Sequence, residues 1–458
     1  MAVLAFDIGT TKICAIVVDE KSGAILECRS EKNAFLPAAN SCDRRQNPEK
    51  IFAVVEELAS GLLNKYRFFR CIGVTGQMHG ILYLDSSGRA VSPLFTWQDS
   101  SASLAMENGE TYSLYLKKIS PGPISPGYGL ATCFFHLKNN QIPKHAARIC
   151  TIGDYVAMRL CASRAPVMHA TNAGGMGFFN LRSLSFDEKS LELAGLDPSL
   201  LPETVAAAEV IGETPGGIPV CVSIGDNQAG FLGSVQDSGE SILVNIGTGS
   251  QISFLGSISV KPDFLEARPF FDGHFLLVGA SLCGGRAYAM LESFFRQVLL
   301  MAGSGGDCSL YEKMDAAADS AIDAALQKMG EPIPGVNTLF AGSRSDPSAR
   351  GCIQNITENN FTPANLAAGF LNGMAQELYD FYAPVKEEND VIHKSLVGGG
   401  NGIRKSRPLR RILSEKFNML LKIPLCQEEA AYGAALFALT GAGYFKNVSQ
   451  AQRLVRYQ

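Results

Sequence analysis

The sequence lacks a long apolar run and a basic leader, and each absence excludes a class of protein. No uninterrupted apolar run approaches the roughly 20 residues that a membrane-spanning helix needs, so no membrane segment is expected. The N-terminus has no basic segment ahead of its first apolar residues, so no signal peptide is expected either. We therefore expect a cytoplasmic protein that does not enter a membrane.

Paired-cysteine motifs are also missing. The 12 cysteines are dispersed and contain no C-x-x-C pair. A zinc site has no ligand spacing to support it, and a disulfide framework is not expected in a chain of 458 residues. Most of the cysteines are expected to be small buried hydrophobic side chains in a reducing compartment.

An excess of positive charge is the third absence. Lys and Arg number 40 against 44 Asp and Glu, which gives a formal net charge of -4 and no electrostatic reason to expect nucleic acid or an anionic membrane as a partner. Hydrophobic residues make up 46% of the chain and charged residues 18%, as in a globular protein with a large interior. A chain of 458 residues is too long for one core of ordinary size. We expect two domains, 1–237 and 238–458, with the boundary near Asp237.

The central stretch of the chain contains two Gly-rich turns. Asp226 lies in the first turn, after the apolar run 218–224. The strand-like run 242–244 opens into the second turn, Gly247-Thr248-Gly249-Ser250. Small residues and closely spaced backbone N–H groups are expected of a phosphate cradle. We interpret Asp226 as a general base for a substrate hydroxyl and the second turn as the holder of the phosphate that the hydroxyl attacks.

The first residues of the chain follow the same plan as the second turn. Ala2 to Phe6 predicts a buried strand that ends at Asp7-Ile8-Gly9-Thr10-Thr11-Lys12, and 13–18 predicts the returning strand. The threonines and backbone N–H groups suit a phosphate, and Asp7 suits a hydrated magnesium ion. Taken alone, this turn is equally well an ordinary hairpin turn. The repeat at 243–254 favours two similar halves that grip different phosphates of one nucleotide across a cleft.

Other segments predict a polar binding site at strand ends. Gly76-Gln77-Met78-His79-Gly80 follows a short buried strand, although a lone histidine is more often structural than functional. Trp97, the only tryptophan, is either a core anchor or the wall of a sugar pocket in which Gln98 and Asp99 bind hydroxyls. Asp154 is a plausible helix cap. The segment 169–179, with Asn172, is predicted to be irregular structure near the cleft.

The late glycine run Gly398-Gly399-Gly400-Asn401-Gly402 precedes a predicted helix at 406–417. Consecutive glycines let a flat ligand such as a purine lie against backbone, which favours an adenosine site. Neither a Walker A loop nor a protein-kinase signature is present. A helix at 427–440, rich in Ala and Gly, is expected to pack closely on its neighbours.

With these motifs assembled, the chain resembles the FGGY carbohydrate kinases over nearly its whole length. The resemblance implies two ribonuclease-H-like, actin-like α/β domains that flank an ATP and sugar cleft, with ATP and Mg²⁺ as cofactors. It implies Asp226 as the base and Asp7 as a magnesium contact, mostly through water. The implied sugar-binding residues are Gln77, Met78, His79, Trp97, Asp99, Tyr128, Asp226 and Asn227. The implied ATP-binding residues are Thr10, Thr11, Lys12, Gly247, Thr248, Gly249, Gly399, Gly400 and Asn401.

Two branches of this family compete as models for the substrate. Gln-Met-His-Gly is similar to a segment that xylulokinases and sedoheptulokinases share, whereas Leu-Phe-Thr-Trp-Gln-Asp looks more like the sedoheptulokinase form. Ser100-Ser101 departs from the pattern, because an arginine often follows in these kinases. The expected function is phosphorylation of the terminal primary hydroxyl of a ketose, sedoheptulose before xylulose. Alternatives are an actin-like or chaperone-like ATPase that acts on no sugar and a sugar-binding regulator without catalysis. The expected partner is a small sugar, and a homodimer is possible.

Overall fold

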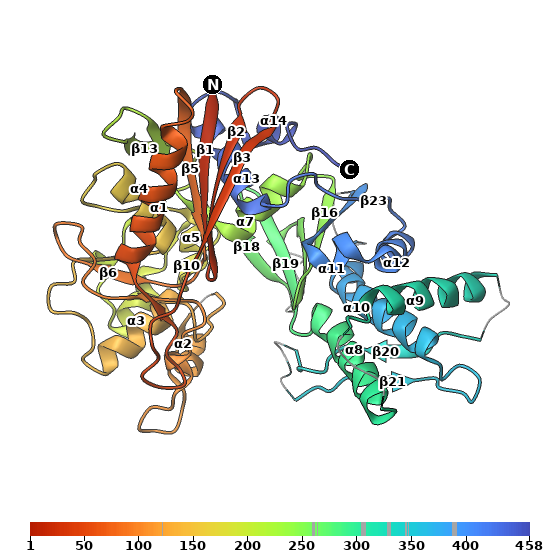
Figure 1. Ribbon diagram of the computed structural model, residues 1–458. Coiled ribbons are helices and arrows are strands. Elements are labelled where there is room, and N and C mark those ends of the chain that lie inside the picture. The colour runs from red at the N-terminus through yellow and green to blue at the C-terminus, as the bar shows by residue number, and fades with distance from the viewer. Residues whose placement is uncertain are drawn as a thin grey trace. The chain divides into compact units, whose positions relative to one another are not determined.

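Figure 1 shows the computed structural model of the chain, which describes residues 1–120, 122–258, 262, 264–303, 308–327, 331–343, 346, 348–386 and 392–458. The chain divides into two compact units. The first unit comprises Met1–Gln236, Arg268–Phe275 and Cys426–Arg456. The second comprises Asp237–Ala267, Leu276–Leu425 and Tyr457–Gln458. Two short segments that come later in the sequence, Arg268–Phe275 and Cys426–Arg456, therefore pack with the first unit.

The first unit is built on a sheet whose strands lie in the order β13-β14-β5-β1-β2-β3, with β15 also paired to β5. The pairs β1–β2 and β2–β3 are antiparallel, whereas β5 runs parallel to β1 and to β14. The strands are β1 (Ala2–Ile8), β2 (Lys12–Asp19), β3 (Ile25–Lys32), β5 (Phe69–Gly76), β13 (Val210–Glu213), β14 (Pro219–Cys221) and β15 (Ile224–Gly225).

Helices cover both faces of this sheet, as its almost continuous apolar central strands require. Alternate residues of β1, such as Leu4 and Phe6, share a core with α1 (Pro48–Leu63) and α4 (Ile152–Leu160). On the other face, α13 (Glu429–Gly441) packs so closely that a Cβ added to Gly73 of β5 would overlap the backbone of Ala434. Helix α7 (Asp226–Ser234) lies beside α13. The close packing predicted for the late Ala- and Gly-rich helix is thus confirmed.

A second apolar core lies under the smaller elements of the same unit. It includes Tyr83, Phe134 and Phe178, all buried. The remaining elements of this unit are β4 (Arg45–Gln46), β6 (Leu82–Leu84), β7 (Leu94–Phe95), η1 (Ser101–Ser103), α2 (Tyr112–Ile119), α3 (Gly129–Lys138), β8 (Arg148–Cys150), β9 (Val167–His169), α5 (Ala170–Ala173), β10 (Phe179–Asn180), β11 (Ser185–Phe186), α6 (Glu188–Ala194), η2 (Pro198–Leu200), β12 (Glu203–Val205) and α14 (Val448–Gln452).

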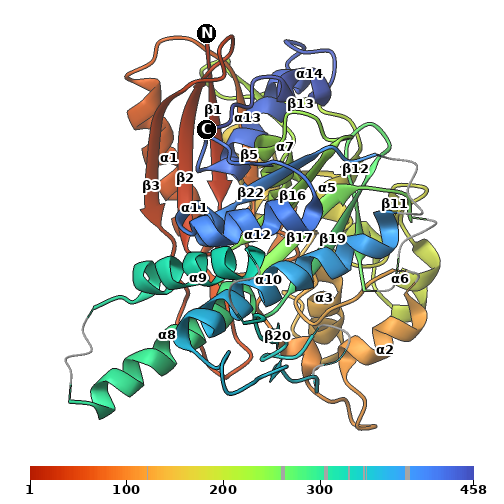
Figure 2. The same cartoon turned by 90° about the vertical axis from the view of Figure 1, so that its right-hand side faces the viewer.

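The second unit repeats the strand connections of the first. Its sheet has the order β18-β19-β17-β16-β22-β23, and Figure 2 shows β19, β17, β16 and β22 side by side. As in the first unit, the opening hairpin is antiparallel and a later strand, β22, pairs parallel to its first strand. The strands are β16 (Ser241–Ile246), β17 (Ser250–Leu255), β18 (Glu266–Pro269), β19 (Phe275–Ser281), β20 (Gly335–Asn337), β21 (Cys352–Gln354), β22 (Ser395–Gly399) and β23 (Leu421–Lys422). The helices are α8 (Gly284–Met301), α9 (Tyr311–Leu326), α10 (Pro363–Lys386), α11 (Gly400–Lys405) and α12 (Arg407–Phe417).

One local prediction is wrong. The segment 169–179, predicted to be irregular, contains the short helix α5, whose first turn is capped by the His169 side chain accepting a bond from the Thr171 N–H. Four helical residues are too few to leave a 3.6-residue pattern in the sequence, so the helix depends on its cap and its burial. Its residue Asn172 is buried and donates to Asp154 Oδ1 at 3.0 Å and to the Ser223 carbonyl at 3.2 Å.

No helix in the part of the chain that the structure describes combines the length and the apolar character that a membrane crossing requires.

Candidate active site

Two carboxylates lie at the ends of strands that both pair with β5 in the sheet of the first unit. Asp7 is on β1, opposite Thr75 of β5, and β15 pairs with the last residues of β5 through Gly225. Asp226 comes directly after Gly225 and begins α7. Because β1, β5 and β15 are parallel, their carboxyl ends meet at one edge of the sheet, where open α/β sheets bind ligands.

Burial raises the pKa values of both acids, and repulsion from neighbouring acids adds to the effect at Asp7. Burial raises the pKa of Asp7 to about 7, and the nearby charges of Asp226 and Glu428 add to this effect while Lys12 opposes it. Burial also raises the pKa of Asp226 to about 6, although the guanidinium of Arg268 lowers it. Two carboxylates with raised pKa values at one strand edge are typical of an active site. They are also a concentration of negative charge that a bound cation would stabilise.

The turn after β1 is held by a network of polar side chains. Thr10 Oγ1 donates to Gln77 Oε1 at 3.3 Å and accepts from Trp97 Nε1 at 3.0 Å. Gln46 Nε2 donates to the Thr10 carbonyl at 2.7 Å, and Gln46 Oε1 accepts from Gln77 Nε2 at 2.8 Å. The predicted ATP residue Thr10 is thus joined to the predicted sugar residues Gln77 and Trp97. Trp97 is 47% exposed, so its reading as a buried core anchor is wrong.

The next two predicted ATP residues, Thr11 and Lys12, are exposed. Lys12 Nζ lies 2.7 Å from each carboxylate oxygen of Glu428, the residue before α13. Burial alone would lower the pKa of Lys12, but the bond to Glu428 outweighs it and the pKa is raised. Sequence reasoning had no signal for Glu428, because it is 416 positions away in the chain.

His79 and Tyr128 form a stacked pair beside the predicted sugar segment. Their ring centroids are 4.5 Å apart and the rings are 11° from parallel. His79 has a φ of 73°, a left-handed backbone that is uncommon for a residue with a side chain, and its Nδ1 lies 2.7 Å from the Gly175 carbonyl oxygen. Backbone strain of this kind clusters at functional sites. Met78 is buried.

Several polar groups next to Asp226 are buried. Asn227 Oδ1 and Gln228 Oε1 have no hydrogen-bond partner within the described ranges, although Gln228 Nε2 donates to the Pro269 carbonyl at 3.0 Å. Buried acceptors without partners are costly, and ligand hydroxyls are one way to satisfy them. Arg268, buried and close enough to lower the pKa of Asp226, was missed because nothing in its sequence surroundings distinguishes it.

Two other acids in this unit bind protein groups. Asp99 is buried, and its two oxygens accept from the N–H groups of Ser101 at 3.1 Å and Arg44 at 3.4 Å. Thr151 is the N-cap residue of α4, and Asp154 completes a capping box by accepting from the Thr151 N–H, so Asp154 takes part in the cap but is not itself the predicted cap residue. Burial raises the pKa of Asp154 to about 7, while its bonds to Thr151 and Asn172 lower it.

The second unit contains the other Gly-Thr turn, between β16 and β17. The Gly247 carbonyl accepts from the N–H of Gly285, and the Thr248 carbonyl accepts from the N–H of Arg286. A Cβ added to Gly284, the first residue of α8, would overlap the backbone of Gly249. The turn is thus fixed against the N-terminus of α8, where the helix dipole favours anions. The first N–H groups of α8 are already bonded, those of Gly285 and Arg286 to the turn and that of Gly284 to Ser281 Oγ at 3.4 Å.

The predicted adenosine segment lies where β22 ends. Gly399 is the last residue of β22, and Gly400 begins α11 with a φ of +79° that favours glycine. Gly400 also lies so close to Asn245 and Ile246 of β16 that a side chain would overlap them. Asn401 follows and is exposed. This segment and the Gly247–Gly249 turn therefore stand at the ends of paired parallel strands in one sheet.

The backbone is similar to those of solved sugar kinases. The xylulose kinase from Rhodospirillum rubrum matches with a TM-score of 0.84 over 100% of this chain and 93% of that chain, at 20% identity. The class defined by this fold is the one predicted from the sequence, a protein of two ribonuclease-H-like, actin-like α/β domains.

Family models identify the chain within that class. The N-terminal domain of the FGGY family of carbohydrate kinases matches residues 2–233, and the C-terminal domain of that family matches residues 243–442. The chain belongs to the FGGY family of carbohydrate kinases. It is an ATP-dependent sugar kinase, and its substrates are small molecules.

Curated relatives share sequence along most of the chain. The sedoheptulokinase of Mus musculus is 27% identical and covers 95% of this chain and 97% of its own length. Glycerol kinase 2 of Sulfolobus acidocaldarius is 23% identical and covers 98% of this chain and 90% of its own. The two relatives act on different substrates by name, so the choice of sugar is a separate question.

Proposed function

We propose that this kinase phosphorylates the terminal primary hydroxyl of a ketose and that the ketose is sedoheptulose. The proposal rests chiefly on Asp226, which begins α7 directly after β15 and has a pKa raised to about 6. A general base works best when its pKa lies near the operating pH. Asp226 is then mostly ionised above pH 7 and basic enough to accept the proton of a hydroxyl.

Phosphoryl transfer depends mainly on positioning and on stabilising charge. In our proposal the N–H groups of the turns after β1 and β16 bind the phosphates, with Thr10, Thr11, Lys12, Gly247, Thr248 and Gly249 as the contacts. Gly399, Gly400 and Asn401 bind the adenosine. Domain closure excludes water during the transfer. Asp226 then removes the proton as the hydroxyl oxygen attacks the terminal phosphate.

The first unit also suits a magnesium ion. Asp7 is a hard oxygen ligand within the electrostatic reach of two further acids, Asp226 and Glu428. Among the described residues these three do not gather closely enough to form a direct ligand set. We therefore propose that Asp7 holds magnesium mostly through water, as Mg²⁺ in kinases prefers. The bound ion would neutralise charge on the phosphate oxygens.

Sugar contacts are proposed for the residues around the Thr10 network and the stacked pair, namely Gln77, Met78, His79, Trp97, Asp99, Tyr128 and Asn227. The buried acceptor of Asn227 is suited to a sugar hydroxyl. Asp99 has both oxygens engaged by backbone N–H groups, so any hydroxyl it binds must share those oxygens. Arg268 and Gln46 join the proposal as residues that orient Asp226 and Gln77.

Sedoheptulose is favoured by two observations. The segment Thr96-Trp97-Gln98-Asp99 resembles the form found in sedoheptulokinases, and proteins of that name from mouse and human are 27% and 26% identical over 95% of this chain. Xylulose is the second candidate, because Gln77-Met78-His79-Gly80 is similar in xylulokinases and solved xylulose kinases share the fold.

An ADP-release assay tests the proposal. Sedoheptulose, xylulose, ribulose, glycerol and gluconate would be compared by kcat/KM at equal ATP and Mg²⁺, with Asp226→Asn as the matched control. We expect the highest value with sedoheptulose and the next with xylulose, both lost in the control. A preference for xylulose would replace the sugar and keep the mechanism. ATP hydrolysis that no polyol stimulates would contradict the proposal as a whole.

A further inference from the structure

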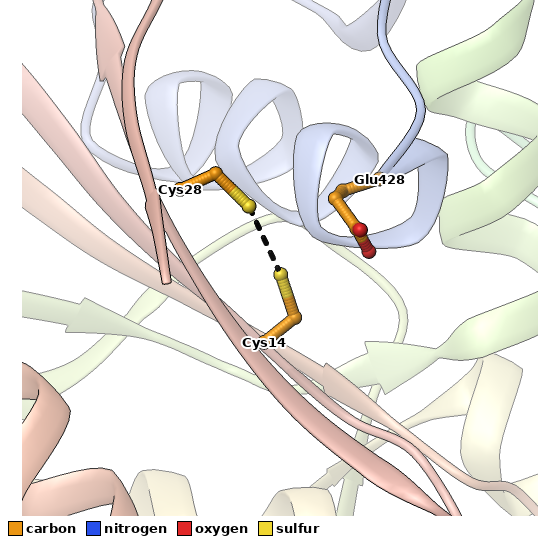
Figure 3. Close-up of side chains that lie close together, drawn as sticks. All are labelled: Cys14, Cys28 and Glu428. Carbon is orange, nitrogen blue, oxygen red and sulfur yellow. Dashed lines mark hydrogen bonds between the residues drawn. The ribbon is translucent and has the colours of Figure 1, made fainter. Parts of the chain in front are cut away.

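A pair of cysteines meets a carboxylate on the far side of the sheet from α1. Cys28 on β3 pairs with Ile16 on β2. Cys14 is two residues before Ile16 on the same strand, so Cys14 and Cys28 lie on the same face of the sheet as diagonal neighbours. Their sulfur atoms are 3.8 Å apart. Figure 3 shows the two sulfurs facing each other, with Glu428 at the start of α13 beside them. One ligand atom from each of the three lies within 4.8 Å of the others.

The distance between the sulfurs suits a bridging metal ion. A disulfide needs the sulfurs at about 2.05 Å, much closer than they are here. Zinc–sulfur bonds of about 2.3 Å at a tetrahedral angle place two sulfurs about 3.8 Å apart. The backbone of β2 and β3 therefore already holds the sulfurs at the spacing that a tetrahedral ion requires.

The third ligand and the local charge also fit. Glu428 accepts from Lys12 Nζ through both oxygens, but a carboxylate has about four lone-pair sites, so one oxygen can bind a metal while the other keeps Lys12. A dication, two thiolates, one carboxylate and the Lys12 ammonium together carry no net charge. Soft thiolate ligands select zinc-like ions over magnesium.

We propose that Cys14, Cys28 and Glu428 form a binding site for a soft divalent ion of the zinc class. On binding, each thiol loses its proton to solvent and forms a sulfur–metal bond, and the S–H···S hydrogen bond between the cysteines is lost. Cys28 is exposed, which gives the ion a path into the site and leaves the fourth tetrahedral position to water. The site adjoins the proposed phosphate turn through Lys12 and Glu428, but neither cysteine has a part in the proposed phosphoryl transfer.

Spectroscopy of bound cobalt tests this site without reference to kinase activity. The full chain, reduced and stripped of metal, would be titrated with Co²⁺, and Zn²⁺ affinity would follow from displacement of the cobalt. We expect one ion per chain, a tetrahedral cobalt spectrum and thiolate-to-cobalt charge-transfer absorption. An octahedral spectrum without that absorption would overturn the proposal.

Variants connect the signal to the three residues. Cys28→Ser, an exposed change, should weaken Zn²⁺ binding at least about 100-fold, because even outer-shell changes commonly cost 10–100-fold. Glu428→Gln should weaken it about tenfold and keep the charge-transfer absorption. Cys352→Ser is the matched control, since Cys352 is exposed on β21 of the second unit, and it should bind as the unaltered chain does. Equal affinity in Cys28→Ser and Cys352→Ser would overturn the proposal.

Discussion

The two units open with hairpins of the same plan and different chemistry. In the first, β1 and β2 flank Gly9 and Thr10; in the second, β16 and β17 flank Gly247 and Thr248. Two residues before the glycine, the first hairpin has Asp7 and the second has Asn245. The same backbone turn is therefore combined with an acid in one unit and with a neutral amide in the other.

The surroundings of the two hairpins also differ in charge. The first hairpin lies among charged groups, including Asp226, Glu428 and Lys12, that shift the pKa of Asp7. The second is fixed by main-chain bonds and by glycines packed on the start of α8. Under the proposed function, this contrast teaches that the same turn of backbone N–H groups can hold phosphate in both units, whereas the reacting charges are added in the first unit only.

Removing the charge found only in the first unit should have the largest effect. Asp226→Asn keeps the shape of the side chain and removes the proposed base, so kcat should fall by about 10²–10⁴-fold. Affinity for ATP should stay nearly unchanged, because the phosphates are assigned to backbone N–H groups. Steady-state kinetics with equilibrium ATP binding would check both. Full turnover in this variant would remove Asp226 from its role.

Asp7→Asn makes the first hairpin match the second at that position. If Asp7 holds magnesium through water, the change removes an outer-shell partner, and activity should fall about 10–100-fold. The Mg²⁺ concentration for half-maximal rate should rise, which a titration at saturating ATP would measure. An unchanged magnesium requirement would mean that Asp7 does not hold the magnesium ion.

Substitutions of two glycines in the second unit should affect protein stability and ATP binding separately. Gly284→Ala should destabilise the protein by about 1–3 kcal/mol, because its Cβ would overlap the backbone of Gly249. Gly247→Ala is the matched change, since no atom lies within 4 Å of its added Cβ. It should leave thermal unfolding unchanged and raise the KM for ATP, because the methyl group fills space assigned to phosphate. Equal loss of stability in both variants would contradict this division.

The raised pKa values of the first unit predict two opposite responses to pH. The rate should fall as pH drops through about 7 to 6, because Asp7 and Asp226 become protonated. Stability should change the other way. Between about pH 4 and 7 the folded chain binds more protons at these acids than the unfolded chain, so their contribution to stability is lost as pH rises.

Paired measurements of kcat/KM and of thermal unfolding across this range would check both responses. Asp226→Asn serves as the control, because it should reduce the pH dependence of stability. The stability of the variant relative to the unaltered chain should be greater at pH 8 than at pH 5. A pH dependence of stability unaffected by the substitution would contradict the assignment.

The smallest expected effect concerns Trp97. Trp97→Phe removes one bond to Thr10, worth about 0.5–1.5 kcal/mol, so the KM should change by no more than about tenfold. As the only tryptophan, Trp97 also reports on the first hairpin alone. Its fluorescence should change on titration with ATP. No fluorescence change at saturating ATP would contradict a phosphate contact at Thr10.

Local sequence signals predicted much of this fold. Asn47 and Thr362 each stand before a proline at a helix start, a pattern typical of a helix cap, and both side chains accept bonds from backbone N–H groups. Gly-Thr turns after short apolar strands and the order of the motifs pointed to the family. Each of these signals lies within a few residues of the feature it predicts.

Features made by distant segments could not be predicted. The approach of Glu428 to Lys12 and of Arg268 to Asp226 depends on how strands and helices assemble, and no local pattern encodes it. Asp99 carried the chemistry of a sugar contact, but its sequence neighbours did not reveal that the Arg44 and Ser101 N–H groups occupy its oxygens.

Helix α13, from near the end of the chain, packs on a sheet whose central strands come from its beginning. It covers the face of the first sheet at Gly73, yet it is made of residues 429–441. During synthesis on a ribosome, that face stays uncovered until nearly all of the second unit has emerged. A fragment cut at the middle of the sequence would consequently expose apolar strands to solvent, which favours aggregation, and the halves of the gene do not encode two independent folding modules.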